Sequence, residues 1–202
     1  MKQKSAPRGP SRDTEEPSAR DTRRILLSPI GNFDPGIYQP VMQKLDQIFG
    51  FKVEEIPLLK NLEFALDEER DQYHSTPILQ KLSDAAPSHA VKVLGVTRVD
   101  LFIPILTHVY GEAQLGGKAC IISTYRLDER TPSMGREITL HERVFKEAVH
   151  ELGHTFKLRH CRDQTCIMHY CRNVADVDRK SNQFCRYCKI LLSDEIKRLA
   201  KK

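Results

Sequence analysis

Apolar side chains recur every four residues in one stretch of the chain. The positions are Leu140, Val144, Ala148 and Leu152. Residues at this spacing share one face of a helix, so the four side chains form a single buried stripe. Thr139 and Glu142 supply the capping-box pattern that starts a helix. We therefore predict a helix from about Leu140 to Thr155, with its end near Phe156.

The rest of the chain alternates strand-like runs with shorter helical stripes. We expect strands at 25–28, 51–56, 91–96, 101–106 and 118–126, a short ribbon at 109–113, and helices that begin at 34–35 and 76–77. The first of these helices should end at Gly50. Strands that alternate with helices predict an α/β fold, and the C-terminal part should end in a helix through Leu199.

The N-terminal segment 1–24 differs in composition from the rest. It is rich in charged residues, Pro and Ser and has almost no apolar side chains, which predicts a disordered tail. Its seven basic and four acidic residues account for +3 of the net charge of +5. The remainder, 25–202, is nearly neutral, which argues against a nucleic-acid groove, and it has no apolar run that could span a membrane. We expect 25–202 to be one domain and the protein to be a monomer.

Three histidines and a glutamate give the strongest chemical signal. Within the predicted helix, His150 and His154 lie one turn apart, so both imidazoles can reach one ion. His160 can join them only if the chain turns back after the helix. A Zn²⁺ ion with three protein ligands keeps a position for water, and the neighbouring Glu151 can take the water's proton. The alternative is a charged helix face with unrelated histidines.

The cysteines form a second group, with the spacing Cys-x4-Cys and, further on, Cys-x2-Cys. Its members are Cys161, Cys166, Cys185 and Cys188. Two such pairs suit a closed tetrahedral zinc site, with disulfides or free thiols as the alternatives. No apolar signal segment precedes them, which favours a reducing, cytoplasmic compartment. Cys120 is expected to be a small buried side chain, and Cys171 a spare thiol or alternate ligand.

These motifs together resemble the archaemetzincins, zinc peptidase-like proteins of the metzincin clan. The matching positions are His150, Glu151, His154, His160, Cys161, Cys166, Met168, Cys185 and Cys188. Further similarity lies at 70–73, 93–97, 100–102, 111–113 and 123–127. The resemblance implies a compact metzincin-like domain with a mixed twisted sheet, an active-site helix and a small C-terminal subdomain. It divides the domain into an upper part, about 25–156, and a lower part, about 157–202.

The same resemblance assigns roles to the site. It implies a catalytic zinc on the three histidines, Glu151 as the general base, and a structural zinc on the four cysteines, two ions per chain. It also places the strand before the active-site helix, at 118–126, along the rim of the cleft, where a peptide could pair with it; an ordinary half-buried strand is the alternative. Met168 would lie beneath the catalytic histidines, and Tyr170 could help hold the oxyanion.

One residue departs from the family pattern. Lys157 stands where the family has a glycine that leaves the helix with a positive φ. A lysine there would bear a strain of about 1 kcal/mol, or else the turn must differ. We therefore keep two hypotheses. The first is a zinc metallopeptidase, an aminopeptidase or an endopeptidase of limited specificity; the alternative is a zinc-stabilised peptide-binding protein with weak or no proteolytic activity.

Overall fold

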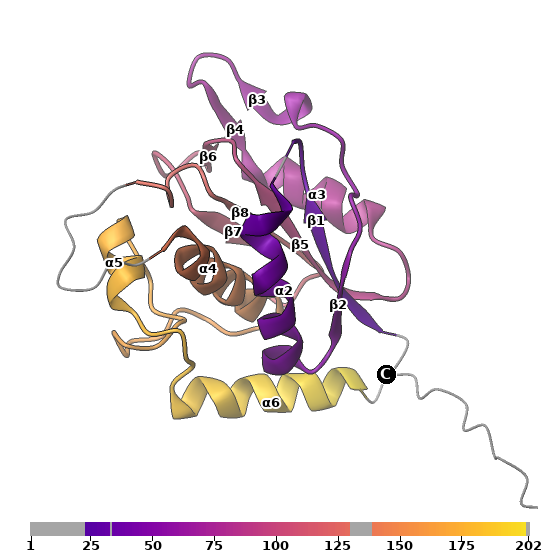
Figure 1. The fold of residues 1–202 in the computed structure, drawn as a ribbon, viewed down its shortest axis with the longest axis vertical. Helices are drawn as coiled ribbons and strands as arrows, with labels where there is room; N and C mark the ends of the chain where they lie inside the picture. The colour runs from indigo at the N-terminus through magenta and orange to yellow at the C-terminus, as the bar shows by residue number, and fades with distance from the viewer. Residues whose placement is uncertain (1–22, 33, 130–138, 201–202) are drawn as a thin grey trace, which may run out of the picture.

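The computed structural model describes residues 23–32, 34–129 and 139–200, and Figure 1 shows their arrangement. The strands are β1 (Arg24–Pro29), β2 (Lys52–Glu55), β3 (Leu66–Asp67), β4 (Gln72–His74), β5 (Ala90–Thr97), β6 (Leu101–Phe102), β7 (Gly111–Ala113) and β8 (Ala119–Ser123). The helices are α2 (Pro35–Phe49), the 3₁₀ turn η1 (Glu63–Ala65), α3 (Ser75–Ala85), α4 (Leu140–Thr155), α5 (Val174–Arg179) and α6 (Arg186–Ala200).

The main sheet is mixed, as predicted. Its strands lie in the order β2-β1-β5-β8-β7, and all neighbouring pairs are parallel except β7, which runs antiparallel to β8 at the edge. A small second sheet has the order β3-β4-β6. Helix α2 connects β1 to β2, and α3 precedes β5, as parallel neighbours require. The connection from β5 to β8 instead runs through β6 and the antiparallel edge strand β7.

Two apolar layers cover the main sheet, one on each face. Alternation along β1 sends Leu26 to one layer and Ile25 and Leu27 to the other. The first layer packs under α3 and includes Ile78, Leu82, Val93 and Ile121. The second packs against α2 and α4 and includes Leu45, Leu94, Ile122 and Val149. The α/β prediction is thus confirmed as helices on both faces of one sheet.

The predicted active-site helix is confirmed, and the predicted rim strand is wrong. Helix α4 spans Leu140–Thr155, with both hydrogen bonds of the capping box between Thr139 and Glu142. The strand expected at 118–126 is the shorter β8, which lies inside the sheet between β5 and β7. The free edge belongs to β7, because the Gly116-Gly117 turn folds β7 back along the outer side of β8. β8 pairs with β5 on its other side, so β7 is the outermost strand. The sequence does not reveal this, because β5 and β8 are far apart in the chain.

The C-terminal part runs below α4 and ends in α6, as predicted. The strand expected at 101–106 is only β6, and its remainder is a loop. Residues 1–22 of the predicted disordered tail lie outside the described residues. Arg24, which was assigned to that tail, instead begins β1, and Arg23 donates a hydrogen bond to the carbonyl of Leu199 at 2.8 Å. The proposed division into upper and lower parts stays a prediction.

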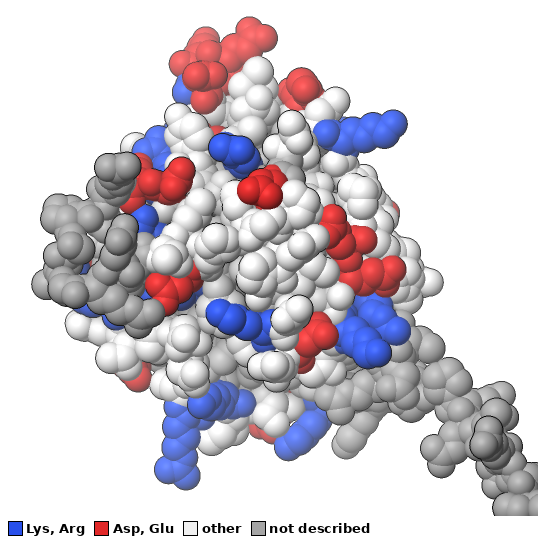
Figure 2. Space-filling model, in the orientation of Figure 1, with Lys and Arg blue, Asp and Glu red and all other residues white. Residues whose placement is uncertain are grey.

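Basic and acidic side chains are interspersed on the face shown in Figure 2. Acidic groups gather at the tip beyond β3 and β4, where the turn carries Glu68, Glu69 and Asp71.

Among the helices that the structure describes, none combines the length and the hydropathy needed to cross a bilayer.

Candidate metal centre

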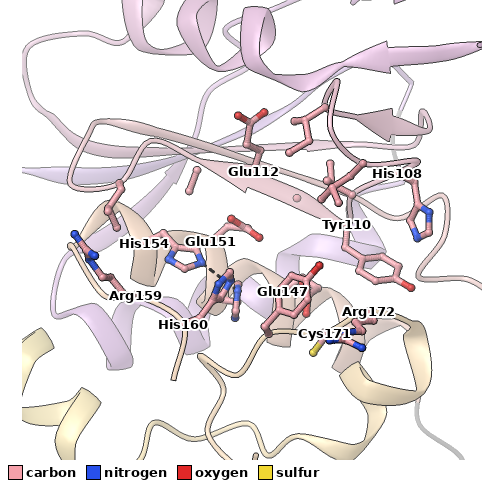
Figure 3. A pocket seen from close by; sticks show the side chains of 18 of the residues that line it. His108, Tyr110, Glu112, Glu147, Glu151, His154, Arg159, His160, Cys171 and Arg172 are labelled. Carbon is pink, nitrogen blue, oxygen red and sulfur yellow. Dashed lines mark hydrogen bonds between the residues drawn. The ribbon is translucent and has the colours of Figure 1, made fainter. Parts of the chain in front are cut away.

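The last two turns of α4 present two histidines to a cleft beneath the sheet edge. Nε2 of His150 lies 3.1 Å from Nε2 of His154, with the rings nearly perpendicular. His160 completes the group, since ligand nitrogens of the three residues all lie within 4.8 Å of one another. The structure therefore brings together the three histidines that the sequence singled out (Figure 3).

A tight turn after α4 delivers His160. Lys157 has φ 66°, and its N–H donates to the carbonyl of His154, while the N–H of Leu158 donates to that of Gly153. This is a Schellman ending with lysine in the left-handed position where glycine is usual. The turn has therefore kept its geometry without the glycine. The Lys157 side chain packs over Gly116, and its ammonium lies 3.5 Å from the carboxylate of Glu195.

Hydrogen bonds to the chain orient two of the imidazoles. Nδ1 of His150 lies 2.8 Å from the carbonyl oxygen of Ile167, and Nδ1 of His154 lies 2.7 Å from that of Leu158. A carbonyl can only accept, so the Nδ1 atoms carry the protons and the two Nε2 atoms face each other with lone pairs. Such a pair at 3.1 Å repels unless a cation lies close to both atoms.

The donor set fits zinc. Zn–N bonds of about 2.0–2.1 Å at a tetrahedral angle separate two ligand nitrogens by about 3.3 Å, close to the separation of 3.1 Å between His150 and His154. Burial lowers the pKa of His150 and of His154, and lowers that of His160 to about 4. The imidazoles are therefore neutral near pH 7, which is the form that binds metal.

Glu151 lies next to the histidines under the edge strand. Its side chain is buried yet borders the cleft, and it passes directly beneath Gly111 of β7. A Cβ atom at Gly111 would lie 2.7 Å from Cγ of Glu151 and 2.6 Å from the carbonyl oxygen of Ile121. Burial raises the pKa of Glu151 well above its ordinary value. A divalent cation bound beside it would favour the ionised carboxylate.

The cleft above these residues has a volume of about 720 Å³. Its apolar wall comes mostly from the loops around the edge strand: Ile103, Leu106, Val109 and Leu115. The opposite side carries the histidines, Glu151 and Tyr170, whose ring centroid lies 5.1 Å from that of His160. The cleft therefore has an apolar wall on one side and the candidate metal ligands on the other.

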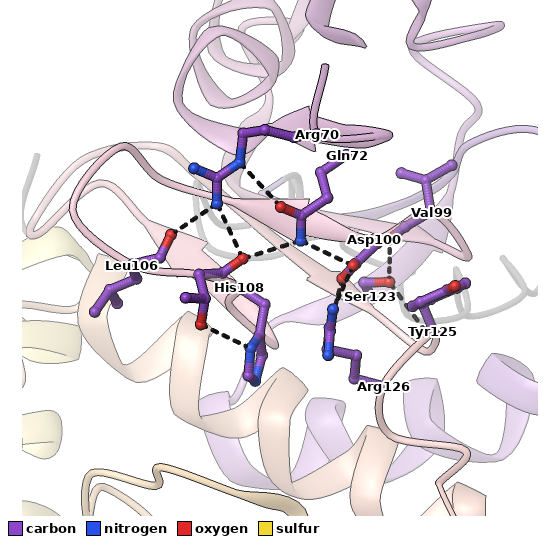
Figure 4. A network of polar contacts seen from close by, with 10 residues as sticks. Arg70, Gln72, Val99, Asp100, Leu106, His108, Ser123, Tyr125 and Arg126 are labelled. Atoms are coloured by element: carbon purple, nitrogen blue, oxygen red, sulfur yellow. Dashed lines mark hydrogen bonds and ion pairs between the residues drawn. The ribbon is translucent and has the colours of Figure 1, made fainter. Parts of the chain in front are cut away.

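A polar network fixes the loop that forms the rim of this cleft (Figure 4). Arg70 donates to the carbonyl oxygens of residues 106 and 107, at 3.2 and 3.1 Å. Gln72 donates to the carbonyl of residue 107 and to Asp100, which also forms a two-pronged ion pair with Arg126 at 2.7 Å. The segments 70–73 and 100–102, which resembled the family, thus position the cleft instead of contributing catalytic groups.

The four cysteines meet in a second cluster beneath α4. Ligand sulfurs of Cys161, Cys166, Cys185 and Cys188 all lie within 4.8 Å of one another. Sγ of Cys161 is 3.8 Å from Sγ of Cys185, and tetrahedral Zn–S bonds of about 2.3 Å give a sulfur separation of about 3.8 Å. The N–H groups of Cys185 and Cys188 point at sulfurs of the cluster, a usual support for thiolate ligands. The set fits zinc.

The two clusters share one stretch of chain. Cys161 directly follows His160, and its N–H donates to the carbonyl of Met168 at 2.8 Å. Met168 is fully buried, and its sulfur packs against Gly153, on the turn of α4 between His150 and His154. The cysteine cluster therefore holds the loop that carries His160 and the side chain that supports the helix.

Several residues of the cleft were missed by sequence reasoning. Lys180 and Glu147 form a buried ion pair that borders it, and Arg159 and Arg172 also line it. Lys180 follows helix α5, whose six residues are too few for an apolar pattern to predict the helix from the sequence. Glu147 could have been found, because it lies one turn before Glu151 on the face that carries His150 and His154. Cys171 lies in the cleft and not in the four-sulfur cluster.

The fold and the histidine centre define a zinc metallopeptidase. The model for "Peptidase family M54" matches residues 60–194. The chain belongs to this family, which confirms the resemblance to archaemetzincins.

Relatives and solved structures agree over most of the chain. The archaemetzincin of Methanocaldococcus jannaschii is 35% identical over 172 residues, 85% of this chain and 93% of that protein. The crystal structure of archaemetzincin from Methanopyrus kandleri superposes with a TM-score of 0.75 at 33% identity, covering 88% of this chain and 98% of the other. A zinc-dependent peptidase from Methanocorpusculum labreanum gives a TM-score of 0.71 at 30% identity, covering 83% and 99%.

Proposed function

We propose that the protein hydrolyses peptide bonds with a catalytic zinc held by His150, His154 and His160, and with Glu151 as the general base. The observation that carries this proposal is the pair of Nε2 atoms of His150 and His154, 3.1 Å apart, with both Nδ1 atoms bonded to carbonyls. Such an arrangement is what a metal-binding imidazole pair requires.

The chemistry divides between the metal and the chain. When bound, zinc would supply a Lewis acid that polarises the scissile carbonyl and makes water more acidic. Glu151 removes a proton from the attacking water and passes it to the leaving amine. Gly111 leaves room for the Glu151 side chain beneath the edge strand. Tyr170, beside His160, would donate a hydrogen bond to the oxyanion.

The substrate would bind as an added strand on β7, the free edge of the main sheet. In the antiparallel ladder with β8, Tyr110 and Gln114 bond to β8. Gly111 and Ala113 therefore turn their main-chain groups to the free edge, over the cleft. Pairing of this kind holds an extended peptide through its main chain, which supports peptides or proteins as substrates. We propose an aminopeptidase or an endopeptidase of limited specificity.

A second zinc would be structural, on Cys161, Cys166, Cys185 and Cys188. Four thiolate ligands close the site and leave no position for water. Cysteine pairs bind metal more often than they form disulfides in a reducing compartment, which supports a cytoplasmic protein. We also propose a monomer that acts on neither nucleic acid nor membranes.

The Glu151→Gln variant tests the mechanism. Gln has the same shape but cannot take a proton, so peptide hydrolysis by the zinc-loaded protein should fall by at least about 100-fold, with unchanged zinc content. Glu63→Gln is the control, because Glu63 is an exposed carboxylate of η1 outside the cleft. Undiminished hydrolysis by Glu151→Gln would exclude this residue as the base.

The second candidate is a zinc-stabilised peptide-binding protein with weak or no proteolytic activity. The observation that favours it is Lys157, which holds a left-handed backbone conformation in the turn that leads to His160. A set of peptides with free and blocked N-termini would separate the candidates. Cleavage of free peptides alone indicates an aminopeptidase, cleavage of both an endopeptidase, and tight binding without cleavage a binding protein.

A further inference from the structure

Two arginines lie at opposite ends of the catalytic histidines. Figure 3 shows Arg159 beside His154 at one end of the cleft, and Arg172 with Tyr110 and Cys171 at the other. Both arginines are exposed and border the cavity. A substrate that runs along the cleft would pass one of them on each side of the scissile bond.

The direction in which a peptide pairs with β7 decides which arginine lies on the C-terminal side of the scissile bond. Antiparallel pairing is the slightly more stable way to add a strand. A peptide antiparallel to β7 has its N-terminal part opposite Ala113 and its C-terminal part opposite Gly111. Tyr110, which precedes Gly111, therefore marks the side of the leaving amine, and Arg172 lies on that side.

Arg172 is also available for a new charge partner. Among residues 23–32, 34–129 and 139–200, no ion pair joins its guanidinium to a carboxylate. Asp176 is the nearest acid along the chain, and its oxygens accept from the main-chain N–H of Arg172 and from the side chain of Arg179. Lys180, the other cation at this end, is bound to Glu147.

Tyr110 supplies a second donor at the same end. The pKa of its phenol is raised to about 12, mainly by burial and also by the negative charges of Glu129 and Glu147. The phenol therefore stays protonated at physiological pH and can donate a hydrogen bond. A guanidinium and a phenol together form a site for a carboxylate.

We propose that Arg172 is a specificity-determining residue that binds a carboxylate on the leaving-group side of the scissile bond. The carboxylate belongs to an acidic side chain of the substrate or to its free C-terminus. The inference rests on the proposed peptidase function, because it uses the same cleft. It predicts a preference for peptides that carry a negative charge on the C-terminal side of the cleaved bond.

The test compares kcat/KM of the zinc-loaded protein for peptides that differ only after the scissile bond, with Glu, Gln or Lys there. We expect Glu to exceed Lys by roughly tenfold, as charged hydrogen bonds allow. Arg172→Gln should abolish the difference, and Arg172→Glu should reverse it. Arg98→Gln is the control, since Arg98 is exposed and outside the cleft. Each peptide is made as the free acid and as the C-terminal amide, which separates the side chain from the C-terminus as the source of the charge.

A binding measurement keeps this test independent of hydrolysis. Fluorescence anisotropy gives Kd of the same peptides for the zinc-loaded Glu151→Gln protein, with and without Arg172→Glu. The inference is supported if carboxylate peptides bind more tightly than the others and Arg172→Glu reverses this preference. This holds even if the wild type cleaves nothing and the proposed function fails. Equal Kd and equal kcat/KM for all peptides, with cleavage intact, overturn the role of Arg172 and leave the peptidase standing.

Discussion

Lys180 and Glu147 form an almost fully buried ion pair at the side of the catalytic cleft, with Nζ 2.7 Å from Oε1. The pair is part of the attachment of α5 to α4. Arg143 forms a two-pronged ion pair with Asp178, and Lys146 donates to carbonyls at the end of α5. Burial alone would lower the pKa of Lys180, but the charge of Glu147 raises it above the ordinary value.

Replacing Lys180 by Met should therefore destabilise the protein strongly. The change leaves Glu147 as a buried charge without its partner, which typically costs about 3–5 kcal/mol. Urea unfolding of the zinc-loaded protein measures the loss. The double variant Lys180→Met with Glu147→Leu removes both charges and should recover most of the stability. If the single variant unfolds at the same urea concentration as the wild type, the pair is not a buried link between α4 and α5.

Lys157→Gly should stabilise the protein slightly. The left-handed backbone at Lys157 costs about 1 kcal/mol for a residue with a Cβ. Glycine relieves this strain, but its greater freedom in the unfolded chain offsets part of the gain. We expect a rise in Tm of roughly 2 °C. Lys157→Ala keeps the strain and loses the contact with Glu195, so its Tm should not rise. Equal Tm values for the Gly and Ala variants would show that the turn is unstrained.

Asp100 should contribute to stability at neutral pH and lose that contribution in acid. Burial would raise its pKa, but hydrogen bonds from Arg126 and Gln72 outweigh burial and lower it below the ordinary 3.8. A lowered pKa in the folded state favours folding above the unfolded value, and the effect disappears as the pH falls through the folded pKa. The stability difference between wild type and Asp100→Asn, measured by urea unfolding, should shrink below about pH 4. A constant difference from pH 7 to pH 3 would contradict this.

The sequence predicted those parts of the site that depend on local spacing. The capping box and the apolar stripe predicted helix α4, and the spacing of His160 predicted the turn after it. Whether Lys157 keeps the left-handed conformation of the family's glycine was left open, and the structure shows that it does. The edge strand was misplaced, because strand order depends on pairing between segments far apart in the chain. Lys180 could not be found for a similar reason. An isolated lysine looks like a surface residue until the fold places it against Glu147.

The protein should bind two zinc ions that differ in their resistance to chelation. Three imidazoles with an open position should release metal to a mild chelator, whereas four thiolates in a closed site should retain it. Elemental analysis before and after chelation is expected to give two ions and then one per chain. If both ions are lost together, the two sites do not differ in their resistance to chelation. If only one ion is found before chelation, one of the two sites does not hold zinc.

Cys185→Ser tests the mechanical coupling between the two metal sites. Cys185 lies far from His160 in sequence, but its sulfur is 3.8 Å from that of Cys161, the residue after His160. Loss of the structural zinc should release this loop and with it Met168, which supports the turn of α4 between His150 and His154. Changes in the surroundings of metal ligands typically cost about 10–100-fold in metal affinity or activity.

We therefore expect Cys185→Ser to weaken zinc binding at the histidines by that factor and to lower Tm, since the binding free energy of a structural zinc contributes to folding. Cys120→Ser is the matched control. Cys120 is fully buried in β8, outside both clusters, and its sulfur donates to the carbonyl of Val93, a bond that a serine hydroxyl can replace. Zinc titration and thermal unfolding of both variants measure the zinc affinity and the Tm. Full zinc content and an unchanged Tm in Cys185→Ser would mean that the four cysteines do not form a metal site, and that His160 is held in place by the Lys157 turn alone.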